Sequence, residues 1–304
     1  MKKGSSLPGF YFNSAAILFG ASFIFFIAQS AYSLIELKAF TMDIGATLLN
    51  AVLSAIMSAL VKTAGEYMKN TLQSENENKK LWNLPHPEHS AIFLSAHKGQ
   101  IRPNHTGTAN PCMVGEGQIQ ALPHIIKSLH QAYGNNYAWD NIYPACNSEA
   151  GAAHHDNKNL ILIGGPLTNQ LTKWLFSDVR NRVDVQLMTN DALHINIPKD
   201  DLPFLRKVER GKVKVNGEKP ITTDYALILH VTLENSRPEH KAVVIAGCNT
   251  FSTGAAAHHF CNLLQKDKKW QDIDGKDYVA VVKCHVNAEH CDCARTELIF
   301  IHAI

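Results

Sequence analysis

The chain has 304 residues, of which 45% are hydrophobic and 18% are charged, and its formal net charge is +2. These averages are typical of a folded protein and exclude a disordered, collagen-like or coiled-coil chain. A nucleic-acid-binding protein usually carries a concentrated basic face, which so small a net charge does not favour. We therefore expect no nucleic-acid partner.

Apolar residues are concentrated near the N-terminus. Residues 15–35 read AAILFGASFIFFIAQSAYSLI, about the 20 residues that a helix needs to cross a membrane. Residues 44–61 form a shorter uncharged stretch, IGATLLNAVLSAIMSALV, whose small residues suit close helix packing in lipid. The sequence thus predicts a cytoplasmic N-terminal tail over residues 1–14 and a two-helix transmembrane hairpin over residues 15–61, with the membrane as a partner.

The lysines predict an orientation for this hairpin. They flank it on both sides and are scarce in its turn: Lys2, Lys3, Lys62, Lys69, Lys79 and Lys80 flank it, and Lys38 lies in the turn. Because lysine and arginine are retained on the cytoplasmic side, we expect a protein of the inner (plasma) membrane whose soluble domain is cytoplasmic. The alternative is a signal peptide cleaved near Ser30, which would export the remaining chain.

The soluble part is predicted to be an α/β domain. Residues 62–87 read as a helical extension followed by a linker that contains Pro85 and Pro87, and residues 88–304 as the folded domain. Apolar runs typical of strands alternate there with helical patterns. Strands are expected at 91–96, 160–163, 183–188, 193–197, 225–231, 242–246, 277–286 and 295–301, and helices at 118–133, 167–176 and 253–264. This alternation favours a Rossmann-like, mainly parallel sheet with antiparallel additions.

Two strand–helix junctions carry glycine-rich loops. The first, GGPLTN, contains Gly164, Gly165, Pro166 and Asn169. The second, AGCNTFSTGAAA, contains the candidate binding residues Gly247, Thr250, Thr253 and Gly254. Glycine lets the backbone approach a ligand, and the N–H groups at a helix start attract anions, so both loops are candidates for binding a nucleotide-like phosphate compound. The alternative is that these small residues merely allow close helix–strand packing.

A long loop after the first strand, residues 97–117, adds further candidates. Its polar residues could contact a phosphate or sugar: Arg102, His105, Thr106 and Gly107. Glu116, at the predicted start of the next helix, could hold a ribose hydroxyl or act as a general acid–base. The alternative here is a solvated surface loop.

The cysteines bear on both compartment and metal binding. Seven cysteines without regular spacing fit reduced cytosolic thiols better than a disulfide framework. In a hairpin turning at 287–288, Cys284 would lie opposite Cys291. Three thiolates could then share one face, so Cys284, Cys291 and Cys293 are weak zinc candidates, although their spacing matches no common zinc motif.

The two glycine-rich junctions resemble a pattern of prokaryotic Rossmann-like domains of the archaeal surface-layer type, with GGP-x-x-N after one strand and an AG loop after a later one. The layout of a two-helix anchor before an α/β domain is similar to that of membrane-anchored nucleotide-sensing effectors of antiviral signalling. Neither resemblance implies a catalytic residue.

Three functions follow as hypotheses. The first is a membrane-anchored sensor or effector that binds a nucleotide-like ligand and acts as a homo-oligomer. The second is an anchored enzyme that cleaves a nucleotide or NAD-like glycosidic bond through Glu116. The third is an exported cell-envelope protein, which takes the surface-layer resemblance literally.

Overall fold

The computed structural model describes residues 44–98, 112–134, 142–144, 157–188, 191–212, 214, 219–234, 239–273, 275–287 and 292–304. The chain divides into two compact units, Met1–Glu75 and Asn76–Ile304. Arg102, His105, Thr106 and Gly107 lie outside the described residues.

The predicted transmembrane hairpin is not confirmed. Segment 15–35 lies outside the described residues, and segment 44–61 belongs to helix α2 (Ile44–Trp82). This 39-residue helix does not end at Val61 but continues through a polar stretch to Trp82. In the part of the chain that the structure describes, no helix is long and apolar enough to cross a membrane.

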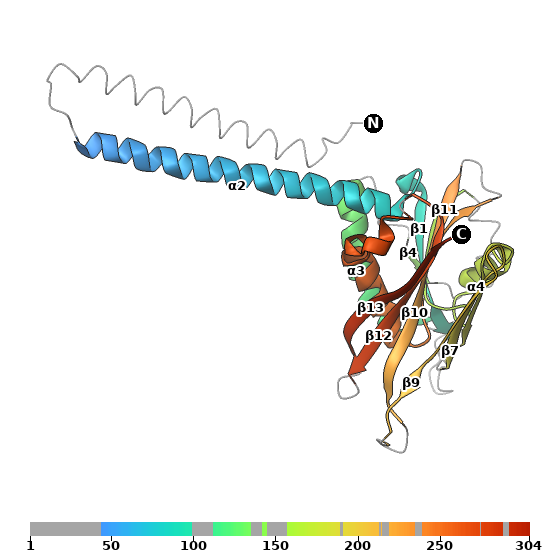
Figure 1. Ribbon diagram of the computed structural model, residues 1–304. Coiled ribbons are helices and arrows are strands. Elements are labelled where there is room, and N and C mark those ends of the chain that lie inside the picture. The colour runs from blue at the N-terminus through green and yellow to red at the C-terminus, as the bar shows by residue number, and fades with distance from the viewer. Residues whose placement is uncertain are drawn as a thin grey trace, which may run out of the picture. The chain divides into compact units, whose positions relative to one another are not determined.

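The second unit is built on an eight-stranded mixed sheet (Figure 1). Its strand order is β13-β12-β10-β11-β5-β1-β4, with β9 paired to β10. The bounds are β1 (Ser90–Leu94), β4 (Ile142–Pro144), β5 (Asn159–Ile163), β9 (Glu209–Arg210), β10 (Ile221–Leu233), β11 (His240–Gly247), β12 (Tyr278–Asn287) and β13 (Asp292–Ala303).

The strand directions correct the prediction of a mainly parallel sheet. β4, β1, β5 and β11 run parallel, whereas β9, β10, β12 and β13 add only antiparallel pairs. Both halves are covered on both faces, so β10 and β12 are as continuously apolar as parallel strands. Hydrophobic runs report burial and not strand direction, which is why the sequence did not reveal the antiparallel half.

Two layers cover the sheet. On one face lie α3 (Glu116–Tyr133), α5 (Thr250–Asn262) and the last turns of α2, which share one hydrophobic cluster. On the other face lie α4 (Gln170–Asp178) and a small antiparallel sheet of β6 (Asp184–Met188), β7 (Ala192–Ile197) and β8 (Leu202–Lys207). The shorter elements are β2 (Ala96–Lys98) paired with β3 (Cys112–Val114), and the 3-10 helices η1 (Pro87–His89), η4 (Leu264–Lys266) and η5 (Lys268–Trp270).

The end of α2 is part of this core. Leu81 and Trp82 are fully buried, and the Trp82 ring packs edge-on against Phe260 with centroids 4.9 Å apart. Trp82 Nε1 also donates to Ser128 Oγ at 2.9 Å. The packed unit therefore includes the end of the predicted helical extension, which the sequence places before the folded domain.

The β12–β13 hairpin forms as expected, but its register differs from the prediction. Cys284 lies opposite Thr296, and a disulfide joins Cys284 to Cys293 with a Cα–Cα distance of 5.9 Å. This corrects the expectation of reduced thiols for these two residues, and a disulfide removes both as zinc-binding thiolates. Cys291 lies outside the described residues, among which no group of three or more potential metal ligands is found.

Candidate functional site at the carboxyl edge of the sheet

The parallel half of the sheet has a topological switch point. The strand order β4-β1-β5-β11 places the first parallel strand inside, with the second on one side and the third on the other. The helices that follow β1 and β5 accordingly lie on opposite faces, α3 on one and α4 on the other. In such sheets ligands bind outside the carboxyl ends of the strands, here between β1 and β5. Both glycine-rich loops emerge at this edge, because β5 and β11 are parallel neighbours.

The first glycine-rich loop is held close to the end of β1. Gly164 is buried, has a φ of 107°, and donates its N–H to Ile245 O at 2.8 Å. A Cβ at this position would overlap Ser95 Oγ. Gly165 is less tightly enclosed, since a Cβ there would lie 3.0 Å from Leu187 Cδ2. Gly164 thus meets two requirements for glycine, positive φ and close approach.

Asn169 caps helix α4 from within the protein. Its Oδ1 accepts hydrogen bonds from Leu171 N at 3.1 Å and Thr172 N at 3.2 Å, and its Nδ2 donates to Phe93 O at 3.4 Å. The side chain is fully buried. The donors that would attract an anion at this helix start are therefore partly used by the chain itself. Pro166, just before, is partly buried.

Residues of the second loop and of the first turns of α5 contact helix α3. Thr253 Oγ1 accepts the Gly247 N–H at 3.0 Å, and Thr250 Oγ1 accepts the Gly117 N–H at 2.9 Å. A Cβ at Gly254 would lie 3.0 Å from Gln120 Cβ. These contacts give the small residues a packing role between the two helices, whether or not they also meet a ligand.

Glu116 begins α3 and is exposed. Its Oε1 accepts a hydrogen bond from Gln120 Nε2 at 3.1 Å. Its proposed acid–base role stays a prediction.

Two buried polar side chains at the switch point lack partners. Ser95 Oγ and Gln118 Oε1 have no hydrogen-bond partner among the described residues, although these side chains are 1% and 8% exposed. A Cβ added at Gly164 would meet both Ser95 Oγ and Gln118 Nε2, so the two side chains converge on this glycine. Helix α3 starts beside them at Gly115, which supplies no side-chain cap. Buried polar groups are normally paired, so this cluster marks the edge as a candidate binding site.

A third group at this edge is Asp224, which is fully buried at the start of β10. Its Oδ1 accepts hydrogen bonds from Tyr225 N at 2.8 Å and Asn249 Nδ2 at 3.2 Å, whereas Oδ2 has no partner among the described residues. Burial raises the pKa of this carboxyl, and the nearby polar groups of Ser252 and Asn249 oppose that rise only in part. A buried acid with a raised pKa is a recognised indicator of functional sites.

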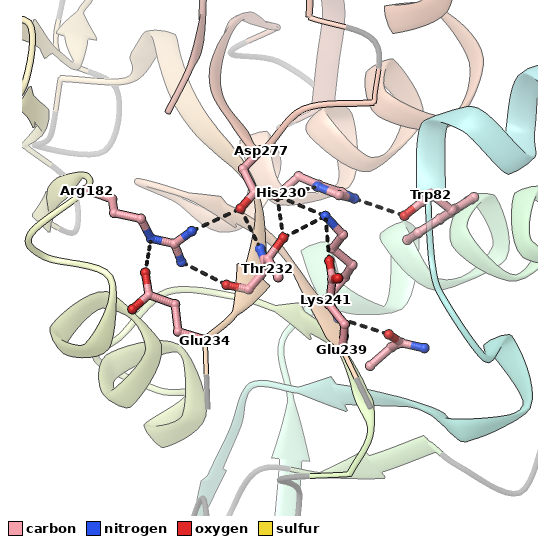
Figure 2. Close-up of polar contacts among 9 residues, drawn as sticks. Trp82, Arg182, His230, Thr232, Glu234, Glu239, Lys241 and Asp277 are labelled. Atoms are coloured by element: carbon pink, nitrogen blue, oxygen red, sulfur yellow. Dashed lines mark hydrogen bonds and ion pairs between the residues drawn. The ribbon is translucent and has the colours of Figure 1, made fainter. Parts of the chain in front are cut away.

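The opposite, amino edge of the sheet contains a polar network around Asp277 (Figure 2). The Asp277 carboxylate accepts hydrogen bonds from Thr232 N at 2.7 Å and Thr232 Oγ1 at 2.9 Å. Lys241 Nζ and Arg182 Nη1 lie 3.1 Å and 3.0 Å from it. Burial alone would raise the pKa of Asp277, but these hydrogen bonds and the Lys241 charge outweigh it and lower the pKa.

Hydrogen bonds at the same edge hold the segment that follows α2, residues 83–90. Asn159 Nδ2 donates to Pro85 O at 2.5 Å, and Asn159 Oδ1 accepts the Lys241 N–H at 3.0 Å. His230 Nε2 lies 2.9 Å from Trp82 O, and burial lowers the pKa of His230 to about 4. The Asp277 carboxylate and the Asn159 amide at this edge therefore have a structural role, because both are hydrogen-bonded within the chain.

The sequence does not predict a role for four of these residues: Ser95, Gln118, Asp224 and Asp277. A signal existed for the two acids, since Asp224 and Asp277 directly precede the apolar runs YALILHV and YVAVV. A charge at the boundary of a buried strand needs a specific partner or a function. No comparable signal marks Ser95 or Gln118, because only the tertiary fold brings them together.

Comparison with known proteins gives one family. Residues 144–264 match the S-layer like family, outer domain, which is less than half of the chain. No curated protein and no solved structure gives a significant match. The matched region runs from the end of β4 through α5 and contains both glycine-rich loops and the small sheet. The chain thus contains an S-layer-like region, in line with the resemblance of the two junctions.

Proposed function

We propose that this chain is an exported cell-envelope protein that presents an S-layer-like domain outside the cytoplasmic membrane. The observation that carries the proposal is the match of residues 144–264 to the outer domain of that family. This interpretation replaces a cytoplasmic domain with an external one, and it assigns the apolar segment 15–35 to export or anchoring.

The Cys284–Cys293 disulfide supports an external location. Disulfides persist in oxidising compartments and are rare in the cytosol, where thiols are kept reduced. Cys248 and Cys261 are free and buried, so they do not conflict with such an environment.

Reporter fusions test the location directly. Alkaline phosphatase, which is active only outside the cytoplasm, and a fluorescent protein that matures inside would each be fused after residue 80 and, separately, after Ile304. We expect phosphatase activity at both positions. Fluorescence without phosphatase activity would place the domain inside the cell and contradict the proposal.

The disulfide can be tested on the same protein. Cleavage after Lys283 and Arg295 yields one peptide, residues 284–295, that holds Cys284, Cys291 and Cys293. If Cys284 and Cys293 are joined, alkylation of the unfolded protein before reduction adds one group to this peptide, and alkylation after reduction adds three. In a Cys293→Ser variant, two groups should be added in either case. Three groups on the unreduced wild-type peptide would remove the support that the disulfide gives.

Binding of a nucleotide-like small molecule at the carboxyl edge is a second candidate function. It is favoured by Ser95 Oγ and Gln118 Oε1, two buried oxygens that have no partner among the described residues and lie at the switch point beside the start of α3. Small molecules released by heat from the detergent-purified chain would be identified by mass spectrometry. A thermal shift by the identified compound should then be lost in a Ser95→Ala, Gln118→Leu double variant and kept in Leu167→Ala, which changes an exposed residue of the nearby loop. Release of no compound, together with no thermal shift across a nucleotide panel, would contradict this function.

A further inference from the structure

The edge strands of the larger two of the three described sheets differ in length and composition. β4 has three residues and ends in Pro144, and β8 contains Pro203 and ends in Lys207. Proline and lysine are common devices that keep a free strand edge from pairing with another chain. β13 has 12 residues and contains neither, and no described strand pairs with its outer side (Figure 1). It is the longest edge strand in the described part of the molecule.

The pairing of β13 with β12 shows which parts of β13 are regular enough to pair with a further strand. Register shifts leave Ala294 and Ile299 unpaired, so β13 has two regular stretches, 295–298 and 300–303. Only the first contains residues of opposite charge, Arg295 and Glu297. Within it, Thr296 faces helix α5, where its Oγ1 lies 3.0 Å from His259 Nδ1. Arg295 and Glu297 fall on the other face by strand alternation, and both are exposed.

The charges of this stretch are self-complementary. If two copies of β13 pair antiparallel with Thr296 on the two-fold axis, Arg295 of each copy lies opposite Glu297 of the other. Moving the axis by one residue would place Arg295 opposite Arg295, or Glu297 opposite Glu297. Opposite charges directly across a pair of strands stabilise the pairing, and like charges destabilise it. Among these three registers, the charges favour the one centred on Thr296.

The neighbouring strand extends this pattern. Glu297 lies opposite Lys283 of β12 within the same chain. In the paired sheet, a row of Lys283, Glu297 and then Arg295 of the second copy would alternate in sign. A two-fold interface of this kind uses the same surface on both copies.

We propose that β13 is a self-association edge, which joins two copies of this chain into one continuous sheet by antiparallel pairing centred on Thr296. The partner is a second copy, because the charge pattern complements itself. The proposal does not rest on an external location, and β13 lies outside the region that matches the S-layer-like family.

Charge reversal tests the pairing. The full chain in mild detergent would be studied by sedimentation over a range of concentrations, as wild type and as the single variants Glu297→Arg and Arg295→Glu. Each variant turns two attractive pairs into two repulsive ones, so we expect dimerisation to weaken about tenfold or more. Lys268→Glu and Asp272→Arg change the charge by the same amounts at exposed positions away from β13 and should dimerise like the wild type.

A mixture of the two single variants provides the decisive measurement. In a mixed dimer, the two arginines of Glu297→Arg face the two glutamates of Arg295→Glu, so the mixture should dimerise again although neither variant does alone. This recovery also shows that both variants are folded. A wild type that stays monomeric, single variants that associate as the wild type does, or a mixture without recovery would each overturn the proposal. Because none of these outcomes depends on cellular location, the reporter fusions and this experiment can fail independently.

Discussion

The two edges of the parallel strands differ in how their buried carboxyl groups are paired. At the amino edge, Asp277 accepts hydrogen bonds from Thr232 and is neutralised by Lys241 and Arg182. At the carboxyl edge, Ser95, Gln118 and Asp224 each bury an oxygen that has no partner among the described residues. Buried polar groups stabilise a fold only when paired and cost free energy when they are not. The contrast is between the paired carboxylate of Asp277 and the Asp224 carboxyl, one of whose oxygens has no described partner; the amino edge too has such atoms, His230 Nδ1 and the Tyr278 hydroxyl.

The largest expected effect is at the amino edge. Replacing Asp277 with Ala removes the carboxylate and leaves Lys241 and Arg182, whose side chains are 9% and 18% exposed, without their shared partner. Breaking a buried ion pair from one side costs about 3–5 kcal/mol, and partial exposure here favours the lower end. Urea unfolding at neutral pH, followed by tryptophan fluorescence, would measure the loss. Glu234→Ala removes an exposed partner of Arg182 and should cost less than about 1 kcal/mol. Equal losses in the two variants would contradict a structural role for Asp277.

A second test of this edge is Asn159→Ala. The Asn159 amide links three segments by bonding to Pro85 O, His86 O and Lys241 N. Its loss takes this partner from the Lys241 N–H and the Pro85 carbonyl, while His86 O keeps its bond from His89 N. We expect a loss of about 2–3 kcal/mol in the free energy of unfolding. Asn262→Ala, whose exposed amide bonds only within its own helix, should change it by less than about 0.5 kcal/mol. Equal losses of unfolding free energy in the two variants would contradict the role of Asn159 in holding the segment at residues 85–86.

The two buried acids should respond oppositely to substitution at neutral pH. The pKa of Asp224 is raised in the folded state, so the stability linked to its protonated form is full below its ordinary pKa and is lost as the pH rises through the raised value. Asp224→Asn cannot ionise and should stabilise the fold by about 1 kcal/mol at pH 7, with the gain vanishing in acid. The pKa of Asp277 is lowered, so its contribution is present above its ordinary pKa and lost as the pH falls through the lowered value. A destabilising Asp224→Asn at pH 7 would show that the ionised carboxylate is needed.

The smallest effect is expected at the switch point. Ser95→Ala removes a buried hydroxyl that has no described partner, so the free energy of unfolding should stay within about 1 kcal/mol of the wild type. The ligand-free chain would be compared with the chain as isolated. A large loss seen only in the chain as isolated would reveal a bound molecule that Ser95 contacts, and a large loss in both would show that the hydroxyl has a structural partner.

Much of the framework was readable from the sequence, and the reasons for the remainder are physical. The apolar runs at 160–163 and 242–246 predicted β5 and β11, and the glycine-rich loops were expected at one edge, as found. The direction of β10 was not readable, because a strand buried on both faces is apolar in either direction. The Cys284–Cys293 disulfide was missed because a register shift in the hairpin changes which cysteines meet.

The polar groups at the two edges illustrate the same limit. Asn169 could be proposed as a helix cap from its position before α4, since capping is local. Ser95, Gln118 and Gly164 come from three separate segments and meet only because β1 and β5 pair. Asp277 and Lys241 likewise meet through tertiary structure, so no spacing rule connects them.

The final turn of α2 has a mechanical consequence. Trp82 is fully buried, contacts Phe260, and binds Ser128 and His230 through its ring nitrogen and its carbonyl. A force applied to the chain at Trp82 would act directly on the hydrophobic core, because α2 ends in residues that belong to that core. Withdrawing Trp82 would require opening that interior, so the place where the chain enters the domain is also a place of high resistance to shear.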